Sequence, residues 1–190
     1  NQSKNNDGTA GATVLDFDDG NDPNLLALEV ATGPSTTATI DLDGGEGQLL
    51  QVAGAISLDV FGFVTLDGSF AFKKATGDFT LADATTLEDV PYLAIGASIE
   101  TATVGAGSVG LELSDIEVAM VLVSDTKGNN TGATPVLTDD VSYTAIRAQV
   151  TDAEIVGITG LTVSVTDFAL EINQSKNNDG TAGATVLDFD

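Results

Sequence analysis

The sequence ISLDVFGFVTLDGSFAF, residues Ile56–Phe72, alternates apolar residues with polar or small ones. A period of two is the pattern of a β-strand, in which successive side chains point to opposite faces. We expect a turn at Asp67-Gly68 to divide the stretch into two strands. Because Phe61 and Phe63 have the opposite parity to the other apolar residues, we also expect this part to be covered on both faces.

The rest of the chain has the same pattern. Turn signals rich in Gly, Asn and Asp separate its apolar runs at short intervals. The nearest approach to helical spacing, NLLALEV at Asn24–Val30, also reads as a buried strand. We therefore predict an all-β fold: an elongated sandwich, roll or solenoid-like module with about a dozen strands and little or no helix.

A glycine motif, GAGSVG at Gly105–Gly110, has the spacing of a dinucleotide-binding loop. Such a loop requires a strand before it and a helix after it. Here Leu111-Glu112-Leu113 continues a strand pattern. We therefore interpret the motif as a glycine-rich hairpin.

Three later segments share a Ser/Thr-Asp step between apolar residues: Leu113–Val118, Val150–Ile155 and Val165–Leu170. In the first and third, the apolar residues are odd-numbered before the step and even-numbered after it. One extra residue inserted in a strand has this effect, so a bulge or corner is predicted. The alternative is that these small polar residues mark tight turns.

The first eighteen residues of the chain return unchanged at its end. Asn1–Asp18 reads NQSKNNDGTAGATVLDFD, and Asn173–Asp190 reads the same 172 positions later. Identity at a fixed period is the mark of a tandem repeat. We expect residues 1–172 to be one complete repeat, cut from a longer protein, and residues 173–190 to begin the next repeat within the same β structure.

No Pro-rich or Ser-rich linker separates the strand pattern of Leu161–Ile172 from the second copy. A flexible connection between repeats would need such a composition. We therefore predict that neighbouring repeats of the same chain abut closely through a shared sheet.

Composition excludes several classes of function. The net charge of −23 repels phosphate backbones and anionic lipid, so we expect no nucleic-acid partner. His and Cys are absent, which removes the commonest catalytic base and the thiolate nucleophile, and we expect no enzyme. A Ser-Lys pair, Ser69 with Lys73 or Lys74, is the remaining alternative, and we interpret these lysines as part of a solvated loop. No apolar run approaches the roughly 18 residues of a spanning helix, so no direct membrane insertion is expected.

One acidic turn is the candidate metal site. Its oxygen-bearing residues are Asp16, Asp18, Asp19, Asn21 and Asp22. Hard oxygen ligands on a flexible loop suit Ca²⁺, and a solvated acidic turn is the alternative. The second copy stops at Asp190, before any counterpart of Asp19, Asn21 or Asp22, so we expect at most one copy to bind calcium. A weaker cluster contains Asp41, Asp43 and Glu46.

The tandem period, the Asp/Gly/Thr/Val-rich strands and segments such as Gly68–Phe72 and Gly157–Val163 resemble the repeats of giant bacterial cell-surface and type I secreted adhesin-like proteins. The resemblance implies an extracellular spacer on the bacterial surface, rigidified by calcium. Gly44-Gly45-Glu46-Gly47 opens like the calcium-binding nonapeptide of β-rolls but has Leu49 where that motif has Asp. A carbohydrate-binding or protein-binding adhesion module, with a cell-surface or matrix ligand, is the alternative function.

Overall fold

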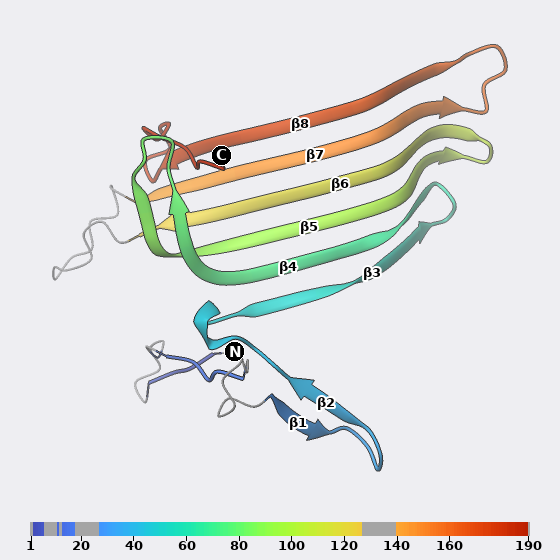
Figure 1. Ribbon diagram of the computed structural model, residues 1–190. Coiled ribbons are helices and arrows are strands. Elements are labelled where there is room, and N and C mark those ends of the chain that lie inside the picture. The colour runs from blue at the N-terminus through green and yellow to red at the C-terminus, as the bar shows by residue number, and fades with distance from the viewer. Residues whose placement is uncertain (1, 6–10, 12, 18–26, 127–139, 190) are drawn as a thin grey trace.

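The structure is a computed structural model that describes residues 2–5, 11, 13–17, 27–126 and 140–189 (Figure 1). Its elements are β1 (Leu28–Ala31), β2 (Thr37–Ile40), the 3-10 helix η1 (Gly44–Glu46), β3 (Leu50–Val60), β4 (Val64–Thr80), β5 (Thr86–Ala106), β6 (Val109–Asp125), β7 (Val141–Val156) and β8 (Val163–Asn177). The predicted all-β fold with little helix is confirmed. Within the described residues the strands are fewer and longer than the dozen expected. The longest, β5, has 21 residues and spans about 70 Å at strand rise.

The six long strands form one antiparallel sheet in chain order, β3-β4-β5-β6-β7-β8, and β1 pairs with β2 in a separate hairpin. Turns of two residues place some sequence neighbours side by side. One such turn, Gly107-Ser108, joins β5 to β6 and confirms the predicted glycine hairpin. Gly105 and Gly110 face each other there, and a Cβ on Gly105 would lie 2.5 Å from the Cα of Gly110.

The turn between β3 and β4 lies at Phe61-Gly62, so the turn predicted at Asp67-Gly68 is wrong. Phe61 and Gly62 both have positive φ, 52° and 70°, and the N–H of Phe63 donates to the carbonyl of Val60 at 2.9 Å. Two central residues with positive φ suit the twist of paired strands. Phe61 and Phe63 are 93% and 58% exposed, so the expected cover on both faces is also wrong. These rings belong to the tip of the hairpin.

A corner crosses strands β5 to β8 near the end seen at the right of Figure 1. The register skips Asp115 in β6, Thr151 in β7 and Asp167 in β8. Asp115 and Asp167 have left-handed φ values of 49° and 53°. Of the two predicted outcomes, a bulge or a corner, the first and third Ser/Thr-Asp segments form a corner, because β5 to β8 each skip one residue there and keep their register. The skipped residue changes the parity and so keeps apolar side chains on one face along each strand.

That apolar face is one of two unlike faces of the sheet. One row across it, in register, consists of Val52, Phe72, Ile95, Met120, Ile146 and Ile172. The neighbouring row on the opposite face is Ala53, Ala71, Gly96, Ala119, Arg147 and Glu171. The edge strands leave apolar side chains such as Val52 and Leu170 44–47% exposed.

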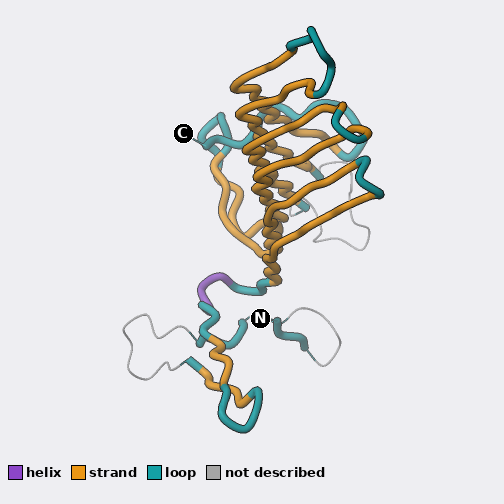
Figure 2. The backbone as a smooth tube through the Cα atoms, turned by 90° about the vertical axis from the view of Figure 1, so that its right-hand side faces the viewer, coloured by secondary structure: helices purple, strands orange, loops and turns teal. Residues whose placement is uncertain are grey.

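The buried core lies on the face of small and polar residues, at one end only. There the β4–β5 hairpin bends over the sheet, as the side view shows (Figure 2). Asp78 and Asp89 hold the bend: Asp89 has a φ of 50°, and its N–H donates to Asp78 Oδ1 at 2.7 Å. A cluster of buried side chains fills the space between the two layers, consisting of Leu81, Leu87, Val90, Val123, Tyr143 and Leu187.

Candidate functional site

The last member of that core, Leu187, belongs to the second copy of the repeated segment. The copy begins inside β8, where Asn173–Asn177 continue the pairing with β7. The chain then turns and comes back along residues 181–188, which we call the returning limb. The N–H of Asn177 donates to the carbonyl of Thr181 at 2.9 Å, and that of Gly183 donates to the carbonyl of Ser175 at 3.0 Å.

The sequence Asn-Asp-Gly explains the turn. Gly180 has a φ of 88°, which an L side chain rarely adopts. Oδ1 of Asp179 accepts from the backbone N–H of Thr181 at 2.9 Å and from its hydroxyl at 2.6 Å. These bonds, the hydroxyl one first, lower the pKa of Asp179. Past the turn, Gly183 passes so close to Ser175 that a Cβ on it would lie 2.1 Å from the Ser175 Oγ.

The returning limb pairs with the tip of the β4–β5 hairpin. The N–H of Ala82 donates to the carbonyl of Val186 at 2.9 Å, and the N–H of Asp188 donates to the carbonyl of Thr80 at 2.8 Å. These two bonds flank the antiparallel bridge between Leu81 and Leu187. Side chains of such a non-hydrogen-bonded pair lie close together, about 4.5 Å apart at Cα. Leu187 is thereby directed into the core.

Side chains of the second copy secure the limb from its other side. Asn173 Nδ2 donates to the carbonyl of Leu187 at 2.7 Å, and Ser175 Oγ donates to the carbonyl of Thr185. Ser175 is itself buried. Asn173 and Ser175 therefore fix, from β8, the backbone that carries Leu187.

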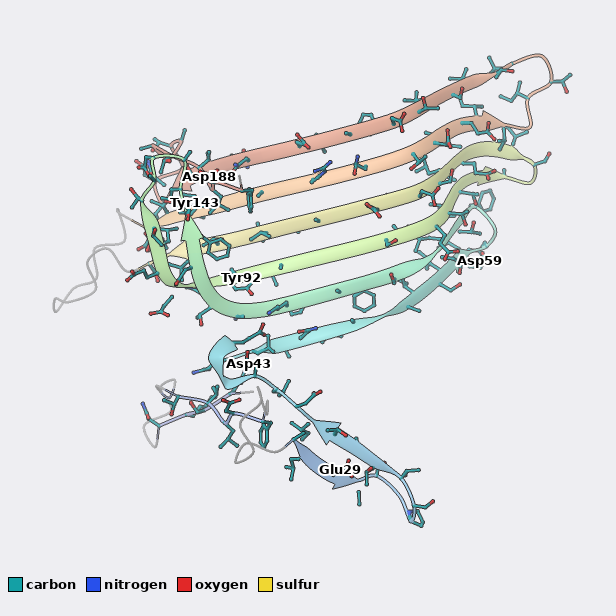
Figure 3. The ribbon with its side chains drawn as sticks, in the orientation of Figure 1. Glu29, Asp43, Asp59, Tyr92, Tyr143 and Asp188 are labelled. Atoms are coloured by element: carbon teal, nitrogen blue, oxygen red, sulfur yellow. The ribbon has the colours of Figure 1, made fainter. Side chains whose placement is uncertain are left out.

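Leu187 packs against five buried side chains from earlier in the chain, which we call the acceptor cluster: Leu81, Leu87, Val90, Val123 and Tyr143. Leu187 is 2% exposed, and complete burial of a leucine side chain stabilises by about 1.5–3 kcal/mol. Next to the cluster, the rings of Phe79 and Tyr92 pack edge to face, with their centroids 5.3 Å apart. Burial, followed by the nearby charges of Asp125 and Asp83, raises the pKa of Tyr143. Figure 3 labels Tyr143 and Asp188 at this end of the sheet.

The first copy shares one backbone contact with the second but lies in a different setting. The N–H of Gly11 donates to the carbonyl of Ser3 at 3.0 Å, as Gly183 does to Ser175. Yet Leu15, the counterpart of Leu187, is 68% exposed. Ser3 Oγ is buried without a hydrogen-bond partner among the described residues, whereas its counterpart Ser175 Oγ donates to Thr185.

The first copy instead contacts the segment before β3 in its own repeat. The N–H of Phe17 donates to the carbonyl of Leu42 at 2.9 Å, and Asp16 Oδ1 accepts from the N–H of Gly44 at 2.9 Å. In extended chain, alternate residues direct their backbone groups to opposite edges. The Phe17 bond therefore uses the edge opposite to that used by Val186 and Asp188 in the second copy.

The candidate metal residues are only partly described. Asp16 bonds to Gly44, as above, while Asp18, Asp19, Asn21 and Asp22 lie outside the described residues. In the weaker cluster, Asp43 Oδ1 accepts from the N–H of Gly45 at 2.6 Å, and Glu46 pairs with Lys73 at 2.7 Å. Within the described ranges no group of three or more acidic side chains is arranged to hold a metal ion.

The lysine of the Ser-Lys alternative has a structural partner. Lys73 Nζ donates to Glu46 Oε1 at 2.7 Å, and this hydrogen bond raises the pKa of Lys73. A lysine base must lose its proton near neutral pH, so the shift opposes that role. Lys73 and Lys74 both lie within β4, so the solvated loop expected for them is wrong, and the Lys73–Glu46 pair joins β4 to η1.

Sequence reasoning placed the repeated segment at the junction of repeats but did not identify Leu187, Ser175 or Asn173. The strand-like run ATVLDF is the available signal, and it occurs in both copies. In the described part of the chain no helix is long and apolar enough to cross a membrane. Comparison with protein-family models, curated proteins and solved structures finds no match.

Proposed function

We propose that the chain is a structural extender repeat, a spacer in a very long extracellular protein of the bacterial surface. The observation that carries this proposal is the burial of Leu187, which belongs by sequence to the next repeat, in the core of this one. A spacer must transmit its direction from one unit to the next. A core shared across the boundary supports that function because the units cannot pivot without exposing Leu187.

In such an array the period of the structure is offset from the period of the sequence. The first residues of each repeat complete the core of the repeat before it, through contacts like those of Val186 and Asp188. On their opposite edge they bond to their own repeat, as Phe17 bonds to Leu42. The repeated segment thus becomes a strand held from both sides, which couples neighbouring units directly.

The strand directions support a sheet shared between repeats. The sheet has six strands that alternate in direction, so its edge strands β3 and β8 are antiparallel to each other. A following repeat in the same orientation can therefore place its β3 beside β8 and continue the alternation. Strands lie about 4.8 Å apart, so each repeat added in this way lengthens the array by roughly 30 Å.

The acidic surface supports a role outside the cell as a soluble fibre. The net charge of −23 makes neighbouring fibres repel one another, which protects long strands from aggregation. Calcium at Asp16, Asp18, Asp19, Asn21 and Asp22 remains part of the proposal as a stiffening ion at the junction. A melting temperature unchanged by a chelator would remove calcium from the proposal. So would calorimetry that shows two equivalent Ca²⁺ ions, one bound to each copy of the repeated segment.

Small-angle scattering of chains with one, two and three repeats tests the proposal. The maximum dimension is expected to grow linearly, by roughly 30 Å for each six-stranded sheet. Growth with the square root of repeat number would indicate beads on a flexible string and would refute the spacer.

A further inference from the structure

We propose that the acceptor cluster is a recognition site for a second copy of this chain, which enters it with residues 13–16 of its first copy. A spacer needs only the covalent junction within one chain, so this inference goes beyond the proposed function. It predicts that separate chains join head to tail through the repeated segment once the attached limb is weakened.

The identity of the ligand is visible in the structure. The acceptor cluster holds Leu187, and the sequence that carries Leu187 occurs a second time in the same chain. Any surface that binds residues 185–188 has the chemistry to bind residues 13–16, because the side chains are the same. Leu15 is 68% exposed and therefore presents to solvent the side chain that the cluster buries.

The hydrogen bonds allow this exchange. The limb pairs with the hairpin tip through Val186 and Asp188, whose counterparts are Val14 and Asp16. The bond from Phe17 to Leu42 uses the other edge of the segment, so it can persist while a second chain binds. The N–H of Gly11 is bonded to its own Ser3, as that of Gly183 is to Ser175, so the exchange concerns only the residues after Gly11.

Competition decides which copy occupies the cluster. The covalently attached limb has an effective concentration on the order of millimolar, so it excludes the other copy in dilute wild-type chain. Weakening the attached limb at Leu187 removes that advantage. The acceptor cluster then takes the intact leucine of a second chain.

The experiment uses the full chain with Leu187→Asp, isotope-labelled for NMR, and an unlabelled peptide of residues 1–18. Peptide binding is expected to return the amide resonances of Leu81, Ala82 and Val90 to their wild-type positions. A peptide with Leu15→Asp is the matched control and is expected to leave them unchanged. Leu187→Ala, a milder variant, is titrated in parallel in case the aspartate prevents folding.

Association of whole chains is the second readout, at physiological ionic strength, where the Debye length is about 8 Å and charge repulsion is screened. The Leu187→Asp chain is expected to gain mass with concentration, and Leu15→Asp/Leu187→Asp to stay monomeric. The proposal is overturned if neither the Leu187→Asp chain nor the Leu187→Ala chain binds the native peptide. It is also overturned if the Leu15→Asp peptide binds as well as the native peptide. Linear growth of multi-repeat chains in scattering would then leave the spacer function standing without exchange.

Discussion

Alanine substitution of Leu187, and separately of Leu15, compares the same local sequence in two environments. Leu187 and Leu15 stand in the same eighteen residues, so the unfolded chain gains or loses nearly the same from either change. Leu187 is 2% exposed and Leu15 is 68% exposed. The difference between the two variants therefore isolates the contribution of the acceptor cluster.

The expected magnitude follows from burial. Truncation of a buried leucine removes its transfer free energy and leaves a cavity, which costs about 2–5 kcal/mol. For a chain of this length each kcal/mol lowers the melting temperature by about 2–4 °C, so Leu187→Ala is expected to lower it by about 4–20 °C. Leu15→Ala changes an exposed side chain and is expected to stay within about 0.5 kcal/mol of wild type.

Urea unfolding followed by circular dichroism measures both variants, with the free energy of unfolding extrapolated to water. Equal losses in the two variants would refute the reasoning, whether both are small or both are large. Small losses would mean that Leu187 is not buried in solution. Large losses would mean that the first copy also has a core to fill within a single chain.

Three further predictions concern other groups. Ser175→Ala removes the donor to Thr185 and is expected to cost about 1–2 kcal/mol, whereas Ser3→Ala is expected to be neutral or stabilising because it removes a buried, unpaired hydroxyl. Asp115→Gly relieves a left-handed φ and is expected to stabilise by about 1 kcal/mol; Asp152→Gly, in the matching segment of β7, is expected to destabilise by about 0.5–1 kcal/mol. Burial raises the pKa of Tyr143, so its contribution to stability is complete below the unfolded value of about 10 and is lost as pH rises through the folded value. Tyr143→Phe is expected to remove that part of the alkaline loss.

Each of these three predictions has an outcome that would contradict it. Equal effects of the two serine substitutions would place both hydroxyls in the same environment. Destabilisation by Asp115→Gly would show that its side chain, and not its backbone, supports the corner. An alkaline unfolding profile unchanged by Tyr143→Phe would mean that the phenol is accessible to solvent.

Local pattern was sufficient to predict much of the fold. Alternation identified the strands, the glycines of Gly105–Gly110 identified a hairpin, and the parity change at Asp115 identified the corner. Each of these features depends on residues close together in the chain. The turn at Phe61-Gly62 was missed because Asp67-Gly68 is the stronger turn dipeptide by composition. Asp67 and Gly68 instead lie where the pairing of β4 with β5 shifts register.

The burial of Leu187 could not be derived from local pattern. Leu15 and Leu187 have the same neighbours in sequence, yet one is exposed and the other is buried. The difference arises because the hairpin tip at Leu81, about a hundred residues earlier in the chain, bends over the sheet to meet the second copy. Sequence periodicity reveals that a unit repeats, but it does not reveal where one folded unit ends and the next begins.

The central claim is that each repeat completes the core of the repeat before it. Thermal unfolding of chains with one, two and three repeats tests it most directly, because coupled units stabilise one another through their shared interfaces. The account predicts a single transition whose melting temperature rises with repeat number, and a smaller rise when the Leu187 of each junction is replaced by alanine. A melting temperature independent of repeat number, in native and substituted chains alike, would contradict it.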